Sequence, residues 1–381
     1  MTRRALALAL LAAALTAAGC GNTDAIRRGG TSGGTTLTVY SSLPTPGRGV
    51  SRDIVDGQKL ALAQAHGKVG RYTINFSSLD EAGGNPGERR EAAAEAARTA
   101  MVDTTTAALI GTVDSAGARS SIPLLNESGV LHVSLGAGYP GFTRPVAEGE
   151  PDRWYPAGRR TFARLVGDDR AHTRALVRAA GARRVVVEAE AGEDAAALAT
   201  EVRRAARAAG VEVADTPGPR GAVIYAGADP VSAAGVADSV ARETPGTRVV
   251  LPDEVVRAGV DRLIRGRAAR QAVFVSSAPA PGSTPELRAF EAAFERAYRR
   301  RPGPYAALGH AAMTTVLAAL TRAAQDEEAG ERQRVLDAFF AAGALDTALG
   351  PLTVEPTGEV SPARFSTYRL SGRRRVYLSA P

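Results

Sequence analysis

The stretch from residue 107 to residue 138 constrains the fold more than any other part of the chain. Two short apolar runs, 107–110 and 130–134, are separated by a helical pattern. Each run ends in a loop of Gly, Ser, Thr and Ala. Apolar runs of this length are typical of strands buried on both faces of a parallel sheet. The stretch therefore predicts a βαβ unit.

The loops of this unit are the first candidate ligand site. Ligands of open parallel sheets collect beyond the carboxyl ends of the strands, and small residues let them approach the backbone closely. The expected helix begins at Asp114 or Ser115, so its free N–H groups and positive dipole end face the first loop. An anionic group on a small ligand suits that position.

The same alternation of strand and helix runs along most of the chain. Strands are expected at 36–40, 72–78, 183–190, 211–215, 221–227, 247–252 and 271–277, and helices at 53–65, 88–101, 172–180, 194–209, 231–243 and 255–265. Asn85 and Pro86 read as the N-cap and first residue of the second of these helices. Helices at 285–299, 305–324 and 331–342 and a short β ending at 349–378 follow. This order indicates an α/β protein with two parallel sheets.

Several motifs resemble type I periplasmic binding proteins, in particular the branched-chain amino-acid-binding (leucine-binding-like) branch that serves ABC importers. The loop 111–115 resembles the hydroxyl-rich loop of that family, and residues 134–137 resemble its Ser-x-Gly-Ala-like loop. Residues 301–312 resemble its Pro-x-x-Tyr-Ala helix start. Residues 349–359 resemble its Gly-x-x-x-Phe-Asp-x-x-Gly hairpin, with Val354 and Glu355 in place of the Phe-Asp pair.

The resemblance implies two doubly wound parallel-sheet lobes joined by three hinge crossings, near residues 165, 277 and 348. Residues 36–165 plus 278–347 would form lobe 1, and residues 166–277 plus 348–381 would form lobe 2. Such a protein closes on a small polar ligand by hinge motion. It would act as a monomer, use no cofactor and deliver its ligand to an ABC permease. A ligand-sensing or structural lipoprotein of the same fold, without a transporter, is the alternative.

The resemblance also assigns ligand-binding residues place by place. Asp114 and Ser115 would hold a ligand carboxylate in lobe 1, and the loop after the next strand would offer backbone groups. An acid of lobe 2 would meet a ligand ammonium; Asp253 is the better match, with Asp229 and Glu254 as rivals, although each can equally be a surface or helix-capping carboxylate. The complete expected set is Asp114, Ser115, Ala137, Gly138, Tyr139, Asp169, Asp229 and Asp253. Gly138 stands where family members often carry Thr.

The N-terminus resembles a bacterial lipoprotein signal. Arg3 and Arg4 precede an apolar run that ends at Gly19 and Cys20, the only cysteine of the chain. The run is too short to span a bilayer, which takes about 20 apolar residues. Residues 1–20 are therefore expected to be a signal peptide with an acylated Cys20, followed by a flexible Gly/Thr-rich linker at 21–35. The protein would be anchored to the outer face of the bacterial cell membrane.

Other function classes fit less well. The formal net charge of +7 falls to +5 without Arg3 and Arg4, and the arginines alternate with acids on helical faces, which argues against nucleic acid. The G-x-G-x-x-G run at 136–141 contains Pro140 and cannot open a helix, and the four histidines have no metal-ligand spacing. No enzyme activity or metal site is expected. The segment 142–162 holds the only tryptophan, Trp154, which either walls the ligand or pins a surface loop.

Overall fold

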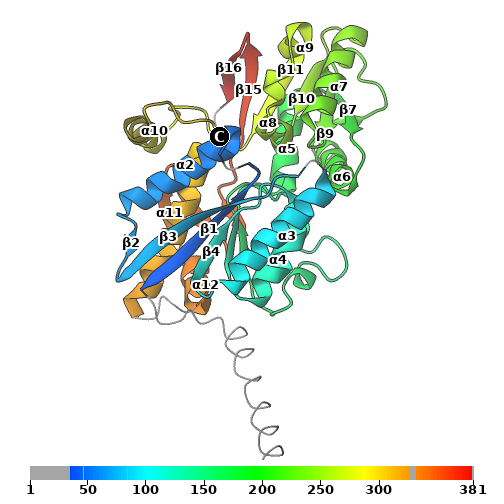
Figure 1. Cartoon of the computed structure of the whole chain (residues 1–381). Coiled ribbons are helices and arrows are strands. Elements are labelled where there is room, and N and C mark those ends of the chain that lie inside the picture. Colours follow the sequence, from blue (N-terminus) through cyan, green and yellow to red (C-terminus); the bar gives the residue numbers. More distant parts are fainter. Residues whose placement is uncertain (1–34, 46, 84, 327–331, 380–381) are drawn as a thin grey trace, which may run out of the picture.

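The computed structural model describes residues 35–45, 47–83, 85–326 and 332–379 (Figure 1). Cys20 and the expected signal peptide lie outside the described residues. Within them, no helix is both long and apolar enough to cross a membrane.

The first half of the chain builds a six-stranded sheet in the order β2-β3-β1-β4-β5-β6. Its pairings are parallel except that of β2 with β3. The elements are β1 (Thr36–Leu43), α2 (Gly49–Gln64), β2 (Lys68–Val69), β3 (Tyr72–Asp80), α3 (Pro86–Val102), β4 (Thr106–Ile110), α4 (Ser115–Glu127), β5 (Leu131–Ser134) and β6 (Phe162–Arg164). Every residue of β4 and β5 is buried, as the apolar runs predicted.

Two helix starts follow the expected capping chemistry. The Asn85 side chain accepts hydrogen bonds from the backbone N–H groups of Gly87 and Glu88, and Pro86 occupies the first turn of α3. Asp114 caps α4 by accepting from the N–H of Gly117 at 2.8 Å. Both caps satisfy N–H groups that have no partner within the helix.

The middle of the chain builds most of a second sheet, of seven strands, in the order β16-β15-β11-β10-β9-β7-β8. Its elements are α5 (Asp169–Ala180), β7 (Arg184–Ala189), α6 (Glu193–Ala208), β8 (Glu212–Val213), β9 (Ala222–Ala226), α7 (Pro230–Glu243), β10 (Arg248–Leu251), α8 (Asp253–Arg257), α9 (Gly266–Gln271) and β11 (Ala272–Ser276). The strands β7 to β11 pair in parallel.

The expected single helix at 255–265 is wrong. Instead α8 ends at Arg257, a 3₁₀ turn follows at Val260–Arg262, and α9 begins at Gly266. Gly259 adopts φ 89°, a left-handed conformation that ends α-helices and that glycine reaches without steric cost. The apolar spacing alone did not reveal this interruption.

The last part of the chain contributes helices and strands to both lobes. The helices are α10 (Pro285–Tyr298), α11 (Ala306–Ala323) and α12 (Arg332–Phe340), and the strands are β12 (Ala344–Thr347), β13 (Gly350–Val354), β14 (Val360–Ser361), β15 (Ser366–Ser371) and β16 (Arg374–Ser379). Helix α11 packs closely on α2, because a Cβ added at Gly57 would lie 2.0 Å from the carbonyl oxygen of Ala306. Strand β15 pairs antiparallel with β11.

Strands β12 to β14 form a separate three-stranded sheet. This small sheet meets the first one, since the backbone N–H of Arg164 donates to the carbonyl of Gly358 at 2.9 Å. The expected lobe boundary at residue 348 falls within the small sheet, and of the residues after it only β15 and β16 pair in the second sheet.

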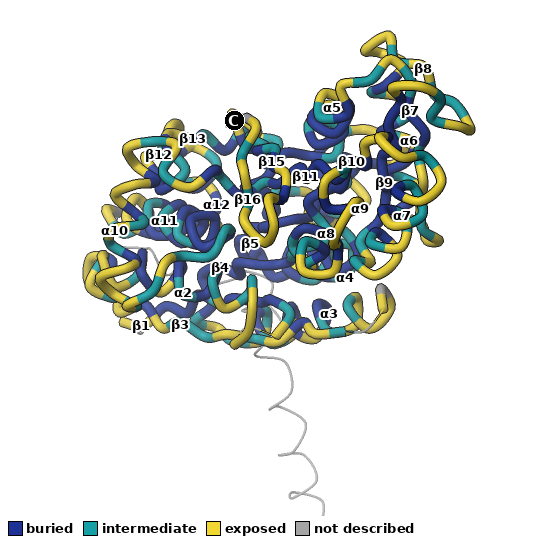
Figure 2. The backbone as a smooth tube through the Cα atoms, turned by 90° about the horizontal axis from the view of Figure 1, so that it is seen from above, coloured by how far each residue is buried: buried dark blue, intermediate teal, exposed yellow. Residues whose placement is uncertain are grey.

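The two large sheets with their flanking helices form two lobes, as Figure 1 shows. The strands at the centre of each lobe are buried, while the outer faces of the helices are exposed (Figure 2). The expectation of an α/β fold with two parallel-sheet lobes is confirmed.

Candidate functional site

The loops after β4 and β5 are tied to each other by hydroxyl groups. The Ser115 hydroxyl accepts the backbone N–H of Tyr139 at 3.0 Å. The Ser134 hydroxyl donates to the carbonyl of Thr112 at 2.9 Å and accepts the N–H of Ala137 at 3.0 Å. The hydroxyl-rich composition of these loops therefore fixes the shape of the cleft face of lobe 1.

The backbone groups expected to meet a ligand already have partners within the protein. The carbonyl of Ala137 accepts from the buried guanidinium of Arg164 at 2.6 Å. The carbonyl of Gly138 accepts from the N–H of Asp169 at 2.8 Å. Asp114 is likewise engaged, because its Oδ2 pairs with Arg89 Nε at 2.9 Å. In this arrangement the two lobes touch each other directly.

Two glycines of this loop make room for side chains of lobe 2. A Cβ at Gly138 would lie 2.0 Å from Oδ1 of Asp169, at the start of α5. A Cβ at Gly136 would lie 2.2 Å from Nη1 of Arg257, at the end of α8. The resemblance implied a threonine hydroxyl at position 138, and in the structure this position faces the carboxylate of Asp169.

Asp253, the expected partner of a ligand ammonium, lies in a buried hydrogen-bond network. Its Oδ1 accepts from Ser276 at 3.0 Å and from the Tyr305 hydroxyl at 2.6 Å, and its Oδ2 accepts from the Ser277 hydroxyl at 2.6 Å. Oδ2 also forms an ion pair with Arg257 Nη2 at 2.5 Å.

Arg257 neutralises Asp253 and reaches lobe 1. Burial acts to raise the pKa of Asp253, but Arg257 and the hydrogen bonds from Ser277 and Tyr305 outweigh it and hold the pKa well below its usual range. The other guanidinium nitrogen of Arg257 donates to the carbonyl of Leu135 at 2.7 Å. Our sequence reading missed Arg257, although its position four residues after Asp253 on one helix was a usable signal.

Asp169, His172 and Glu254 form a second cluster, with one ligand atom from each residue within 4.8 Å of the others. Burial, with Glu254 next in effect, raises the pKa of Asp169 to about 7. Burial and the charge of Asp253 raise the pKa of Glu254 to about 7. Glu254 Oε2 is buried and has no hydrogen-bond partner among the described residues. Both carboxylates lack a neighbouring Lys or Arg within ion-pair distance in the described structure.

The cluster suits an ammonium group better than a metal ion. His172 Nε2 accepts the backbone N–H of Asp253 at 3.2 Å, so the proton of the neutral ring sits on Nδ1. That nitrogen faces Glu254 Oε1 at 3.6 Å and cannot ligate a metal while it carries the proton. The sequence gave no hint of this cluster, because Asp169 and His172 lie on α5 whereas Glu254 comes from α8, far along the chain.

Asp229 lies apart from these groups. It is exposed and caps α7 by accepting from the N–H groups of Val231 and Ser232. Tyr225, from the strand before it, is buried and donates its hydroxyl to Glu190 at 2.7 Å. The side-chain hydrogen bonds of Asp229 described in the structure serve its own helix, while its backbone N–H donates to Glu190 at 3.0 Å.

The segment 142–162 forms an aromatic cluster that holds Tyr139. The Tyr139 hydroxyl donates to Glu150 at 3.0 Å, and Phe142 packs edge-on against both Tyr139 and Trp154. The guanidinium of Arg119 lies 4.4 Å from the centre of the Tyr139 ring and pairs with Asp194 of α6 at 3.1 Å. This arrangement fits a pinned surface loop that also supports a contact between the lobes.

Glu81 is a buried acid of lobe 1 that the sequence did not reveal. It is 4% exposed, and its Oε1 has no hydrogen-bond partner among the described residues. Burial raises its pKa to about 8, against a lowering by Ser42, and the charge of Asp114 adds to the rise. The group is therefore mostly protonated at neutral pH.

Residues 34–223 match the family model described as periplasmic binding protein. No curated protein matches the sequence significantly.

Among solved structures, similarity extends over nearly the whole chain. The ABC transporter substrate-binding protein of Desulfitobacterium hafniense in complex with Leu aligns with a TM-score of 0.72 at 16% identity, covering 90% of this chain and 100% of that one. The leucine-binding protein LivK of Thermotoga maritima aligns with a TM-score of 0.72 at 18% identity, covering 90% and 98%. A solute-binding protein of an ABC transporter from R. palustris, in complex with benzoate, aligns with a TM-score of 0.68 at 20% identity, covering 91% and 97%. With its two lobes and this family match, the chain belongs to the periplasmic binding protein family.

Proposed function

We propose that this protein is the extracytoplasmic solute-binding component of an ABC importer and that it performs no chemistry on its ligand. The proposal is supported by the two-lobed fold and by the roles of the similar structures, which are ABC transporter binding proteins. The ligand would bind between the loops after β4 and β5 and the elements α5 and α8. Closure of the lobes by hinge motion would then present it to the permease as a monomeric complex.

The ligand we propose is a small molecule with an ammonium group, such as a branched-chain amino acid or a related amide. The observation that carries this choice is the pair of carboxylates Asp169 and Glu254, which have no Lys or Arg within ion-pair distance in the described structure, while the neighbouring Asp253 is neutralised by Arg257. An ammonium group would supply the missing positive charge and would hold both acids ionised.

A calorimetric screen of amino acids, their amides and simple amines tests the ligand class. Asp169→Asn should weaken binding of the identified ligand by roughly 2–5 kcal/mol, the scale for removing one partner of a buried charge pair. Asp215→Asn, an exposed acid on the loop after β8, is the matched control and should bind as the wild type does. Binding of only neutral or anionic compounds, with unchanged affinity in the Asp169 variant, would refute the ammonium assignment.

Membrane attachment through Cys20 is part of the proposal and has its own test. Cys20→Ser should move the protein from the membrane fraction to the soluble extract, because the described residues hold no helix that could replace the anchor. Retention of the variant in washed membranes would contradict lipidation. Uptake of the identified ligand by cells with and without this protein then tests the importer role.

A further inference from the structure

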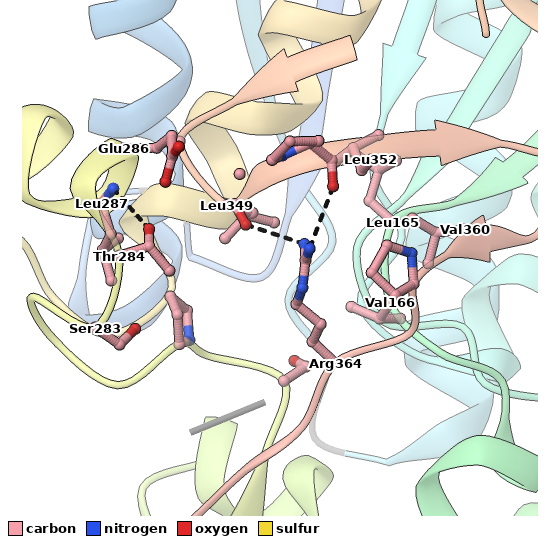
Figure 3. Close-up of a pocket in the computed structure, with 16 residues that line it drawn as sticks. Leu165, Val166, Ser283, Thr284, Glu286, Leu287, Leu349, Leu352, Val360 and Arg364 are labelled. Atoms are coloured by element: carbon pink, nitrogen blue, oxygen red, sulfur yellow. Dashed lines mark hydrogen bonds between the residues drawn. The ribbon is translucent and has the colours of Figure 1, made fainter. Parts of the chain in front are cut away.

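A cavity of about 230 Å³ lies where the chain passes between the lobes (Figure 3). One water molecule needs about 10–15 Å³ of such space. The cavity therefore has room for a small organic molecule. Its walls are mainly apolar and include Leu165, Val166, Leu287, Leu352 and Val360.

The walls come from every passage of the chain between the two large sheets. Val166 lies between β6 and α5, Pro279 lies between β11 and α10, and Pro362 lies between β14 and β15. Any rotation of one lobe against the other must change the torsions of these segments. The size of the cavity is therefore linked to the degree of closure.

One cation points into this apolar cavity. Arg364, a half-buried residue, donates Nη1 to the carbonyl of Leu349 at 3.0 Å and Nη2 to the carbonyl of Pro351 at 3.2 Å, as the dashed lines of Figure 3 show. These two bonds fix the guanidinium and leave three of its five N–H donors for another partner. No carboxylate of the described residues lies within ion-pair distance of Arg364. Glu286 also lines the cavity, is exposed, and lies close enough to Arg364 for their charges to attract, so its negative charge opposes an occupant that carries more than one carboxylate.

We propose that this hinge cavity is a second ligand site, which takes a small apolar monocarboxylate with its carboxylate on Arg364. A preformed apolar pocket with a few fixed polar groups is the usual form of a small-molecule site. Ser277 connects the cavity to the candidate cleft, because it lines the cavity and donates its hydroxyl to Asp253. The cavity has this shape while the lobes are in contact. A molecule bound in it therefore stabilises the closed arrangement and strengthens ligand binding in the cleft.

The test uses benzoate and hexanoate as probes, titrated into the full protein without any cleft ligand. Ser283→Phe fills the cavity from a position whose side chain is exposed, and Arg364→Gln removes the charge. Each variant should weaken both probes about tenfold or more, the effect of losing a charge-assisted hydrogen bond or the cavity itself. Arg369→Gln on β15, an exposed arginine outside the cavity, and Ser283→Ala are the controls and should bind as the wild type does.

A second readout follows closure. Trp154, the only tryptophan of the sequence, packs beside Arg119 at the contact between the lobes, so its fluorescence should change as a probe saturates the wild type and stay constant in Ser283→Phe. Unchanged affinity for the probes in both Ser283→Phe and Arg364→Gln would place the probes in the cleft and overturn the proposal. Absence of any binding by either probe would overturn it as well. Neither result bears on the ammonium site, whose variants and ligands are different.

Discussion

Substitution of Gly138 by alanine is expected to hold the lobes apart. The new Cβ would lie 2.0 Å from Oδ1 and 2.9 Å from Cγ of Asp169, and the next nearest atom, at 3.4 Å, is the Oδ2 of the same residue of lobe 2. Folded proteins do not tolerate such contacts below about 3 Å, so the lobes must separate or the aspartate must leave its position. Because the nearest atoms all belong to lobe 2, lobe 1 itself should fold normally.

The size of the effect follows from the cost of overpacking. An extra methyl group in a close-packed contact costs about 1–3 kcal/mol. If this cost falls only on the closed arrangement, the ratio of closed to open protein drops about 5- to 150-fold. Apparent ligand affinity falls by as much as the closed fraction does.

Small-angle scattering of the ligand-free protein measures the change directly. Gly138→Ala should scatter as a larger particle than the wild type, whereas Gly235→Ala should not, because a Cβ at that glycine of α7 meets no atom within 4 Å. Asp169→Ala combined with Gly138→Ala removes the clash and should restore the compact form. The reasoning fails if the single Gly138 variant scatters like the wild type, or if the double variant stays as open as the single one.

Three further predictions concern buried and bridging charges. Arg257→Met leaves the carboxylate of Asp253 buried without its cation and should lower the free energy of unfolding in urea by about 3–5 kcal/mol, a loss that a second change, Asp253→Asn, should partly reverse. Glu81 binds its proton more tightly in the native state, so the free energy of unfolding should fall by up to about 1.4 kcal/mol per pH unit as pH rises from the unfolded pKa near 4.5 towards about 8. In urea unfolding, Glu81→Gln should lack this dependence of stability on pH. An equal pH dependence in both proteins would contradict the assignment. Arg119→Ala removes the ion pair with Asp194 between the lobes and should favour the open form by no more than about 1 kcal/mol, as measured by small-angle scattering. High salt should weaken the ion pair of the wild type and so reduce the difference between the two proteins; a difference that does not depend on salt would exclude an ionic cause.

The sequence predicted the framework well because its signals were local. The buried strands β4 and β5, the caps at Asn85 and Asp114, and the alternation of strand and helix each depend on a few neighbouring residues. The helix expected at 255–265 failed for the opposite reason. Its apolar spacing is helical, but Gly259 takes a left-handed conformation that periodicity does not register.

The candidate site was predicted less completely, because its electrostatics depend on contacts between distant segments. Asp253 could be selected as a lobe 2 acid, but its neutralisation by Arg257 and its bond to Tyr305, the residue before α11, required the fold. The perturbed Asp169 and Glu254 lie far apart in sequence and meet only after both lobes have formed. From the sequence, Gly138 indicated only that an expected hydroxyl is missing. In the structure, the lack of a Cβ at Gly138 leaves room for the side chain of Asp169.

The late return of the chain to both lobes determines the order in which the protein can be completed. Strand β11 remains an unpaired edge until β15 has been made, and α2 lacks its partner helix until α11 has been made. Neither lobe is therefore a finished unit when the first 276 residues have left the ribosome. An exposed strand edge at that stage invites pairing with other chains. Export of the chain in an unfolded state, with folding delayed until the last strands arrive outside the cell, would avoid this hazard.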